Sequence, residues 1–166
     1  MPNDLRPEFF RRLDDSDDES FYLIPRLVVH IDDAAIKKVG DIYREHLPRG
    51  GAILDLMSSW RSHLPPELKP SRVVGLGLNR PEMADNPALT EIVTHNLNRL
   101  PQMPFEDAYF DLVISNGVLN LIPDKQTAFK EIARILRPKG ALIAADLVVI
   151  ETIPPEVLAS TDAWST

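Results

Sequence analysis

A chain of 166 residues with 44% hydrophobic content is long enough for one domain with a single buried core. Its net charge of −7, without an evident basic patch, argues against a nucleic-acid partner, and no apolar run approaches the ~20 residues that span a bilayer. Because it has no cysteine and four scattered histidines, we expect neither disulfides nor a metal site. The N-terminus lacks the apolar core of a secretory signal, so we expect a cytoplasmic location.

The chain begins with an acidic segment. Five acidic residues lie between Asp14 and Glu19, which predicts a solvated arm over residues 1–20 ahead of one domain over residues 21–166. The first helix signal follows at Asp32, a residue type that caps helix N-termini, and apolar residues then recur at helical spacing as far as Leu47.

Short apolar runs alternate with helical segments along the rest of the chain. We predict strands at 52–57, 73–78, 91–97, 110–115 and 141–149, and helices at 60–64, from Pro81 onward and at 125–136. The last helix carries one apolar stripe that we expect to face the core, formed by Ala128, Phe129, Ile132, Ile135 and Leu136. This alternation predicts an α/β fold with a mostly parallel sheet of about five strands, helices on both faces and strand 52–57 at the centre. Ligands of such sheets bind beyond the carboxyl ends of the strands, so the residues that follow each strand form the candidate site.

Two segments carry a family resemblance. Residues 104–111 (PFEDAYFD) and residues 131–140 (EIARILRPKG) match in order and spacing the segments around the fourth strand of Rossmann-like S-adenosylmethionine-dependent methyltransferases, and the resemblance covers roughly Ala52 to Val149. Residues 115–126 (SNGVLNLIPDKQ) are similar to arsenite methyltransferases, whereas the part before Asp111 looks more like a methyltransferase-like branch with a degenerate glycine loop. Arsenite itself is rejected as substrate, because those enzymes hold trivalent arsenic through cysteine thiolates.

The resemblance implies S-adenosylmethionine as cofactor, held in a weakened site. Asp55 keeps the family's acidic residue at the first strand, but bulkier residues replace the glycines that follow, so Ser58 and Ser59 would line that loop. Gly77 falls where the family has an acid that binds the ribose hydroxyls. Asn79 could take over with neutral hydrogen bonds, and the loss of a charged acceptor would cost about 1.5–3 kcal/mol.

The third and fourth strand ends complete the expected site. By the same resemblance, Asn96 would accept a bond from the adenine amino group, and Asn116 and Gly117 would lie beside the methyl donor. The cofactor-binding residues that we expect are Asp55, Ser58, Ser59, Gly77, Asn79, Asn96, Leu97, Asn116 and Gly117. No catalytic residue can be assigned, which is tolerable because methyl transfer to a good nucleophile needs mainly proximity and alignment.

Two functions remain open at this level. The chain is either a methyltransferase acting on an unidentified small molecule or a non-catalytic or truncated module of the same fold for binding or assembly. A nicotinamide-dependent oxidoreductase is disfavoured, because no GxGxxG follows the first strand. The family usually adds two more strands after the fifth, and residues 151–166 are too few for them. We therefore expect strand 141–149 to be an exposed edge that pairs with a second copy, unless the tail from Ile153 folds over it.

Overall fold

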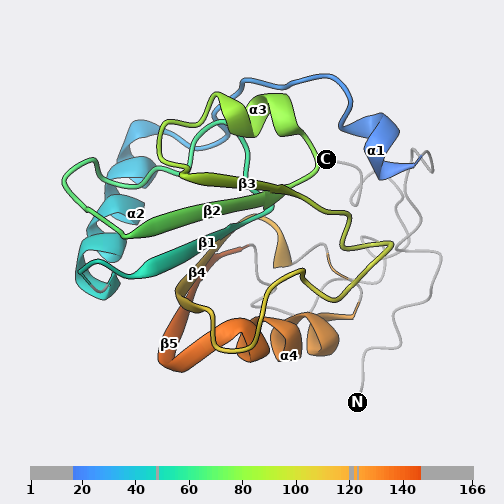
Figure 1. Cartoon of the computed structure of the whole chain (residues 1–166). Coiled ribbons are helices and arrows are strands. Elements are labelled where there is room, and N and C mark those ends of the chain that lie inside the picture. The colour runs from blue at the N-terminus through green and yellow to red at the C-terminus, as the bar shows by residue number, and fades with distance from the viewer. Residues whose placement is uncertain (1–16, 48, 120–121, 123, 147–166) are drawn as a thin grey trace, which may run out of the picture.

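Five parallel strands form one sheet at the centre of the molecule. The computed structural model describes residues 17–47, 49–119, 122 and 124–146 of the chain. The elements in chain order are α1 (Asp18–Phe21), α2 (Asp33–His46), β1 (Ala52–Leu56), β2 (Arg72–Gly77), α3 (Arg80–Ala84), β3 (Glu91–Thr94), β4 (Phe110–Asn116), α4 (Lys125–Ile135) and β5 (Leu136–Ala145) (Figure 1). The strand order is β3-β2-β1-β4-β5, and each neighbouring pair is parallel. The predicted α/β fold and the central place of β1 are confirmed.

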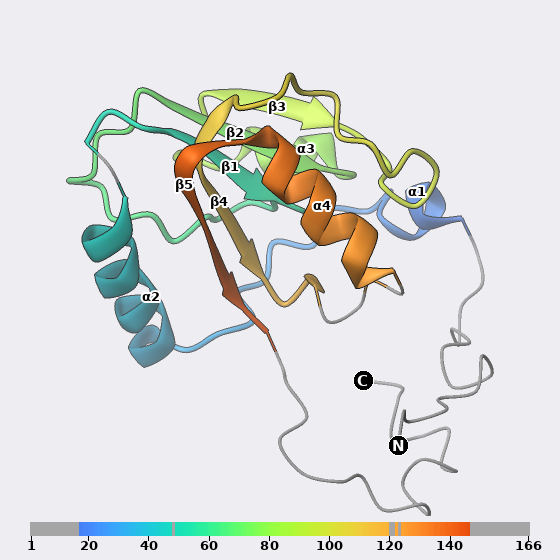
Figure 2. The same cartoon turned by 90° about the horizontal axis from the view of Figure 1, so that it is seen from below.

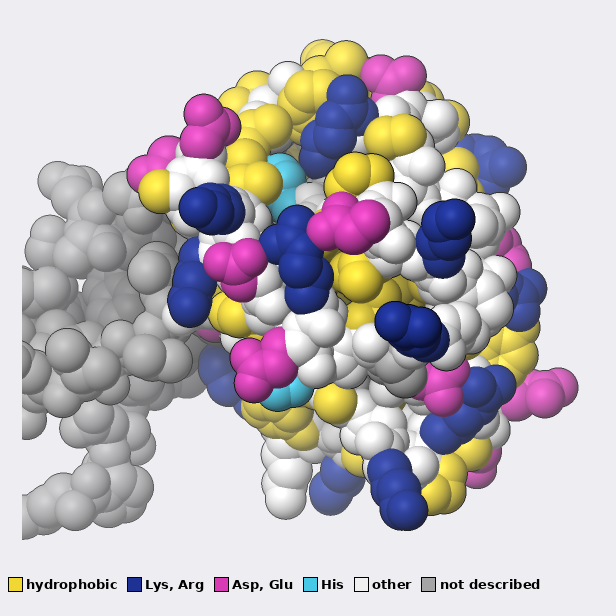
Figure 3. Space-filling model, turned by 90° about the vertical axis from the view of Figure 1, so that its left-hand side faces the viewer, with side chains coloured by type: hydrophobic (Ala, Val, Ile, Leu, Met, Phe, Trp, Pro, Cys, Tyr) yellow, Lys and Arg dark blue, Asp and Glu magenta, His cyan; other side chains and the backbone are white. Residues whose placement is uncertain are grey.

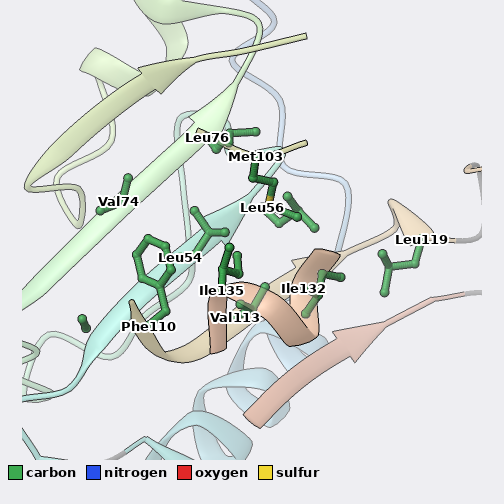
Figure 4. Close-up of a cluster of buried hydrophobic side chains, with 11 residues drawn as sticks. Leu54, Leu56, Val74, Leu76, Met103, Phe110, Val113, Leu119, Ile132 and Ile135 are labelled. Atoms are coloured by element: carbon green, nitrogen blue, oxygen red, sulfur yellow. The ribbon is translucent and has the colours of Figure 1, made fainter. Parts of the chain in front are cut away.

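Both faces of the sheet are covered, which explains why β1 is buried along its whole length. Successive side chains of a strand point to opposite faces. Leu54 therefore belongs to the core under α4, whereas Ile53 belongs to the core under α2. Figure 2 shows these two helices on either side of the sheet, and Figure 4 shows the α4 core, in which Phe110 packs among side chains of β1, β2 and α4.

An aspartate caps the N-terminus of each of the two long helices. Asp32 accepts a hydrogen bond from the backbone N–H of Ala35 at 2.8 Å, which confirms it as the N-cap of α2. Asp124 caps α4 in the same way, accepting from the backbone N–H of Thr127 at 3.0 Å. Each cap satisfies an N–H that has no partner within its helix.

Arg134 links the two segments that carry the family resemblance. Its Nη1 donates to the carbonyl of Phe105 at 2.8 Å and to Asp107 at 2.7 Å, and its Nη2 donates to Glu131 at 2.5 Å. Glu131 in turn accepts from the backbone N–H of Met103 at 2.7 Å. The segment before β4 is thus fixed to α4, and the two sequence blocks that carry the resemblance are in direct contact.

Four details differ from the sequence predictions. Residues 60–64 do not form a helix, because Ser58 and Ser62 bond back to Asp55 instead of continuing a helical turn. The third strand ends at Thr94 rather than at 97, since the side chain of Asn96 caps a turn. The fifth strand begins at Leu136 and not at 141, with an irregularity in its pairing opposite Phe110 and Leu112. Phe129, predicted on the buried stripe of α4, is 47% exposed.

Parts of two predictions fall outside the described residues. Of the arm predicted at 1–20, residues 1–16 lie outside them, and so do residues 147–149 of the predicted edge strand. In the described part of the chain, no helix is long and apolar enough to cross a membrane.

The face on which the strands begin is covered with interspersed charges of both signs (Figure 3). Several arginines near these strand starts are paired with acids. Arg44 of α2 bonds Glu67 at 2.6 Å, and Arg137 of β5 bonds Asp111 at 2.7 Å. Pairs this exposed contribute on the order of 0–1 kcal/mol each, so the apolar cores supply most of the stability.

The core predicts a clear contrast between two phenylalanines. Phe110 is fully buried, with edge-on contacts to Phe105 and Tyr109 at centroid distances of 4.9 Å. We expect Phe110→Ala to lower the free energy of unfolding by about 3–5 kcal/mol in urea denaturation, because it leaves a cavity. The exposed Phe129→Ala is the control and should cost less than about 1 kcal/mol. Equal losses in the two variants would contradict the assignment of the core.

Candidate functional site

The predicted site residues all lie at the carboxyl edge of the sheet or in the loops directly after it. Asp55 is the last residue but one of β1, Gly77 is the last residue of β2, and Asn116 is the last residue of β4. Because the strands are parallel, these ends meet along one edge. The remaining members lie after these strands or, for Asn96 and Leu97, after β3: Ser58, Ser59, Asn79, Asn96, Leu97 and Gly117.

Asp55 is the centre of a buried hydrogen-bond network. Its Oδ2 accepts the hydroxyl of Ser58 at 2.7 Å and the hydroxyl of Ser62 at 2.5 Å. Burial raises the pKa of Asp55 from 3.8 to about 6, and the two serine bonds moderate that rise. Burial also raises the pKa of the Tyr43 phenol, with a further contribution from the charge of Asp55. The carboxylate therefore organises the loop after β1.

That loop lies directly against the end of β2. The backbone N–H of Ser58 donates to the carbonyl of Leu76 at 2.8 Å. A Cβ built on Gly77 would stand 2.7 Å from the carbonyl oxygen of Ser58, which is closer than real Cβ atoms approach. Gly77 is therefore needed so that the loop can cross, and an acidic side chain at this position would displace it.

Glu82 is a site residue that the sequence reasoning missed. It is buried in α3, where its Oε2 accepts the hydroxyl of Ser59 at 2.7 Å and its Oε1 accepts the backbone N–H of Arg26 at 2.5 Å. The spacing of Asn79 and Glu82 is that of a capping box, and this signal could have pointed to it. Glu82 instead joins the loop after β1 to the segment after α1.

The asparagines at the edge divide into two kinds. Asn79 caps α3 by accepting the backbone N–H of Glu82 at 3.0 Å, and its Nδ2 donates to the carbonyl of Tyr22 at 2.7 Å. The Oδ1 of Asn96 accepts the backbone N–H of Asn98 at 3.0 Å. Both amides are thus engaged within the chain. Asn116, in contrast, is exposed.

Open space surrounds the end of β4. Gly117 has φ of +67°, and a Cβ added to it would meet nothing within 4 Å. A small cavity of about 50 Å³ lies beside it, between α2 and the ends of β4 and β5, and its lining is mostly apolar: Val39, Ile42, Tyr43, Ser115, Asn116, Ile143, Ala144 and Ala145. Among the described residues, no cluster of His, Asp and Glu could hold a metal ion.

The sequence of this region is similar to a known family. Residues 63–144 match the methyltransferase domain family. The arsenite methyltransferase of Halobacterium salinarum is 36% identical over 84 residues, which cover 51% of this chain and 21% of that protein. The demethylmenaquinone methyltransferase of Lactiplantibacillus plantarum is 32% identical over 121 residues, covering 67% of this chain and 49% of that protein. The chain therefore spans about a fifth and about half of these two relatives.

A solved structure supports the same fold. The crystal structure of the PH0226 protein from Pyrococcus horikoshii superposes with a TM-score of 0.56 at 19% sequence identity, over 75% of this chain and 64% of that one. At this identity the likeness concerns the fold alone.

The buried carboxyl predicts a pH-dependent stability. In the folded chain Asp55 keeps its proton up to about pH 6, whereas the unfolded chain loses it near 3.8. Since the folded state then binds more protons at this carboxyl, the contribution of Asp55 to stability should fall by up to roughly 3 kcal/mol as the pH rises from about 4 to about 6. Urea denaturation across this range should show that Asp55→Asn removes the fall, while the exposed Asp33→Asn keeps it. A fall of the same size in Asp55→Asn would contradict the assignment.

Proposed function

Because this chain belongs to the Rossmann-like S-adenosylmethionine-dependent methyltransferase family, we propose that it transfers the methyl group of S-adenosylmethionine to a small-molecule acceptor. The observation that carries the proposal is the open end of β4, where Asn116 and Gly117 face free space beside an apolar cavity. Non-catalytic assembly, the other function open from the sequence, is not favoured by the family match.

The end of β4 fits the cofactor, whereas the end of β2 does not offer the acid that the family resemblance would place there. Gly117 lets a ligand approach the backbone closely, and the exposed amide of Asn116 can both donate and accept. We propose that Ser58, Ser59 and Leu97 contribute backbone contacts, because the side chains of the two serines are bonded to Asp55 and Glu82. The exception is Gly77, which offers no carboxylate. The cofactor would supply an electrophilic methyl group, and the chain would position it.

Asp55, Asn79 and Asn96 have an indirect part in this proposal. Asp55 holds the loop after β1 by accepting the hydroxyl of Ser58, and Asn79 caps the start of α3. The Asn96 side chain orders the turn after β3, so its neighbour Leu97 is held at the same edge. Each of these side chains therefore supports the site through the backbone that it fixes.

The acceptor site is proposed to lie on the α2 side of the end of β4. The cavity there has room for a small apolar group, and Ser115 and Asn116 are its polar members beside Tyr43. The hydroxyl of Ser115 is buried and has no hydrogen-bond partner among the described residues. An acceptor that combines an apolar body with a polar reacting atom fits this lining.

We further propose that two copies pair through β5. Its outer side forms the edge of the sheet in the described part of the chain, and such edges invite pairing. Sedimentation of the purified chain should give a dimer that Val148→Lys dissociates, whereas the surface change Lys130→Ala leaves it intact. A monomer at high concentration would remove this proposal.

Cofactor binding is the direct test of the proposed function. We expect calorimetric titration with S-adenosylmethionine to give saturable binding, and Asn116→Ala to weaken it about fivefold, as for one lost neutral hydrogen bond. Gln126→Ala, an exposed amide on α4, should bind like the unmodified chain. No heat with the unmodified chain, or equal affinity in Asn116→Ala, would contradict the proposed site.

A further inference from the structure

The end of β2 has no carboxylate of its own for a ligand. Gly77 is blocked by the carbonyl of Ser58, and Asp55 is buried under two serine hydroxyls. Glu82 uses one oxygen for the backbone N–H of Arg26 and the other for Ser59. A ligand with a pair of hydroxyl groups at this edge would therefore find no charged acceptor on the strands β1 and β2 or on α3.

Helix α1 lies across this part of the edge. The ends of β2 and β3 are neighbours, since the carbonyl of Gly77 accepts the backbone N–H of His95 at 3.1 Å. Side-chain contacts hold the α1 segment against the residues that follow β2 and those that follow β3. Its C-cap residue Tyr22 accepts from Asn79 at 2.7 Å, and Glu19 pairs with Arg99 at 3.1 Å after β3. Figure 1 shows α1 beyond the side on which these strands end.

Glu19 is the acid of α1 that keeps an oxygen free for a ligand. Its Oε1 pairs with Arg99 and accepts from Asn96 at 3.5 Å, whereas its Oε2 accepts no hydrogen bond among the described residues. Its side chain is 52% exposed. Asp17 differs, because one of its oxygens caps α1 and the other pairs with Arg99. The Oδ2 of Asp18 accepts from Asn98 at 2.7 Å.

We propose that Glu19 supplies the carboxylate that Gly77 lacks, and that its Oε2 accepts hydrogen bonds from the vicinal hydroxyls of the cofactor's ribose. This inference rests on the proposed cofactor site. Arg99 and Asn96 hold the carboxylate by its other oxygen, so the acceptor is oriented before the ligand arrives. Helix α1 then becomes part of the binding site, and its docking and the binding of the ligand stabilise each other.

A ligand pair tests this contact. Calorimetric titrations would use S-adenosylmethionine and its 2′,3′-dideoxy analogue with the unmodified chain, with Glu19→Gln and with Glu45→Gln, an exposed change of the same charge in the last turns of α2. We expect Glu19→Gln to weaken S-adenosylmethionine about tenfold, as for the loss of a charged acceptor. It should leave the affinity of the dideoxy analogue unchanged, and Glu45→Gln should change neither.

The outcomes separate this inference from the proposed function. An equal loss for both ligands in Glu19→Gln would mean that Glu19 acts only by docking α1, and it would overturn the ribose contact. Unchanged affinity for S-adenosylmethionine would overturn it as well, while the cofactor site itself stood. A chain that binds neither ligand would reject the proposed function and this inference together.

Discussion

The loop after β1 passes so close to the end of β2 that a side chain on Gly77 would meet the carbonyl of Ser58 at 2.7 Å. This contact is held from two sides. On the β1 side, Asp55 accepts hydrogen bonds from the hydroxyls of Ser58 and Ser62. On the α3 side, Glu82 accepts a hydrogen bond from the hydroxyl of Ser59. Most features of the edge follow from it, because the crossing loop cannot begin a helix and leaves no room for an acid at the end of β2.

The same constraint changes how the edge can bind a ligand. The side chains that a methyltransferase-like sequence would present at β1 and β2 are engaged in holding the loop, so the free groups lie at the end of β4 and on α1. Asn116 and Gly117 are exposed, and Glu19 is held over the end of β3 with one oxygen that accepts no hydrogen bond from the described residues. A site divided in this way depends on elements far apart in the chain, with the central sheet fixing the distance between them.

The fold could be predicted from the sequence because its signals are local. The apolar run Ala52–Leu56 and the helical stripe of α4 each carry their own period, and their alternation implies a parallel sheet. The helix expected at 60–64 was wrong because side chains of this segment bond outside it: Ser62 bonds to Asp55, and the side chain of Trp60 donates to the carbonyl of Val28. Neither bond can be read from local spacing. Glu82 was missed for the same reason, because its partners Arg26 and Ser59 are distant in sequence.

We propose that the carboxyl edge of this sheet binds S-adenosylmethionine at the end of β4. Backbone amide chemical shifts of isotope-labelled protein, followed during titration with S-adenosylmethionine, test it most directly. The largest changes should fall on Asn116, Gly117 and Leu97 and on the loop from Ser58 to Ser62, with α1 changing in parallel. Changes confined to the open groove beside Lys130 and Arg134 of α4, or no changes at all, would contradict it.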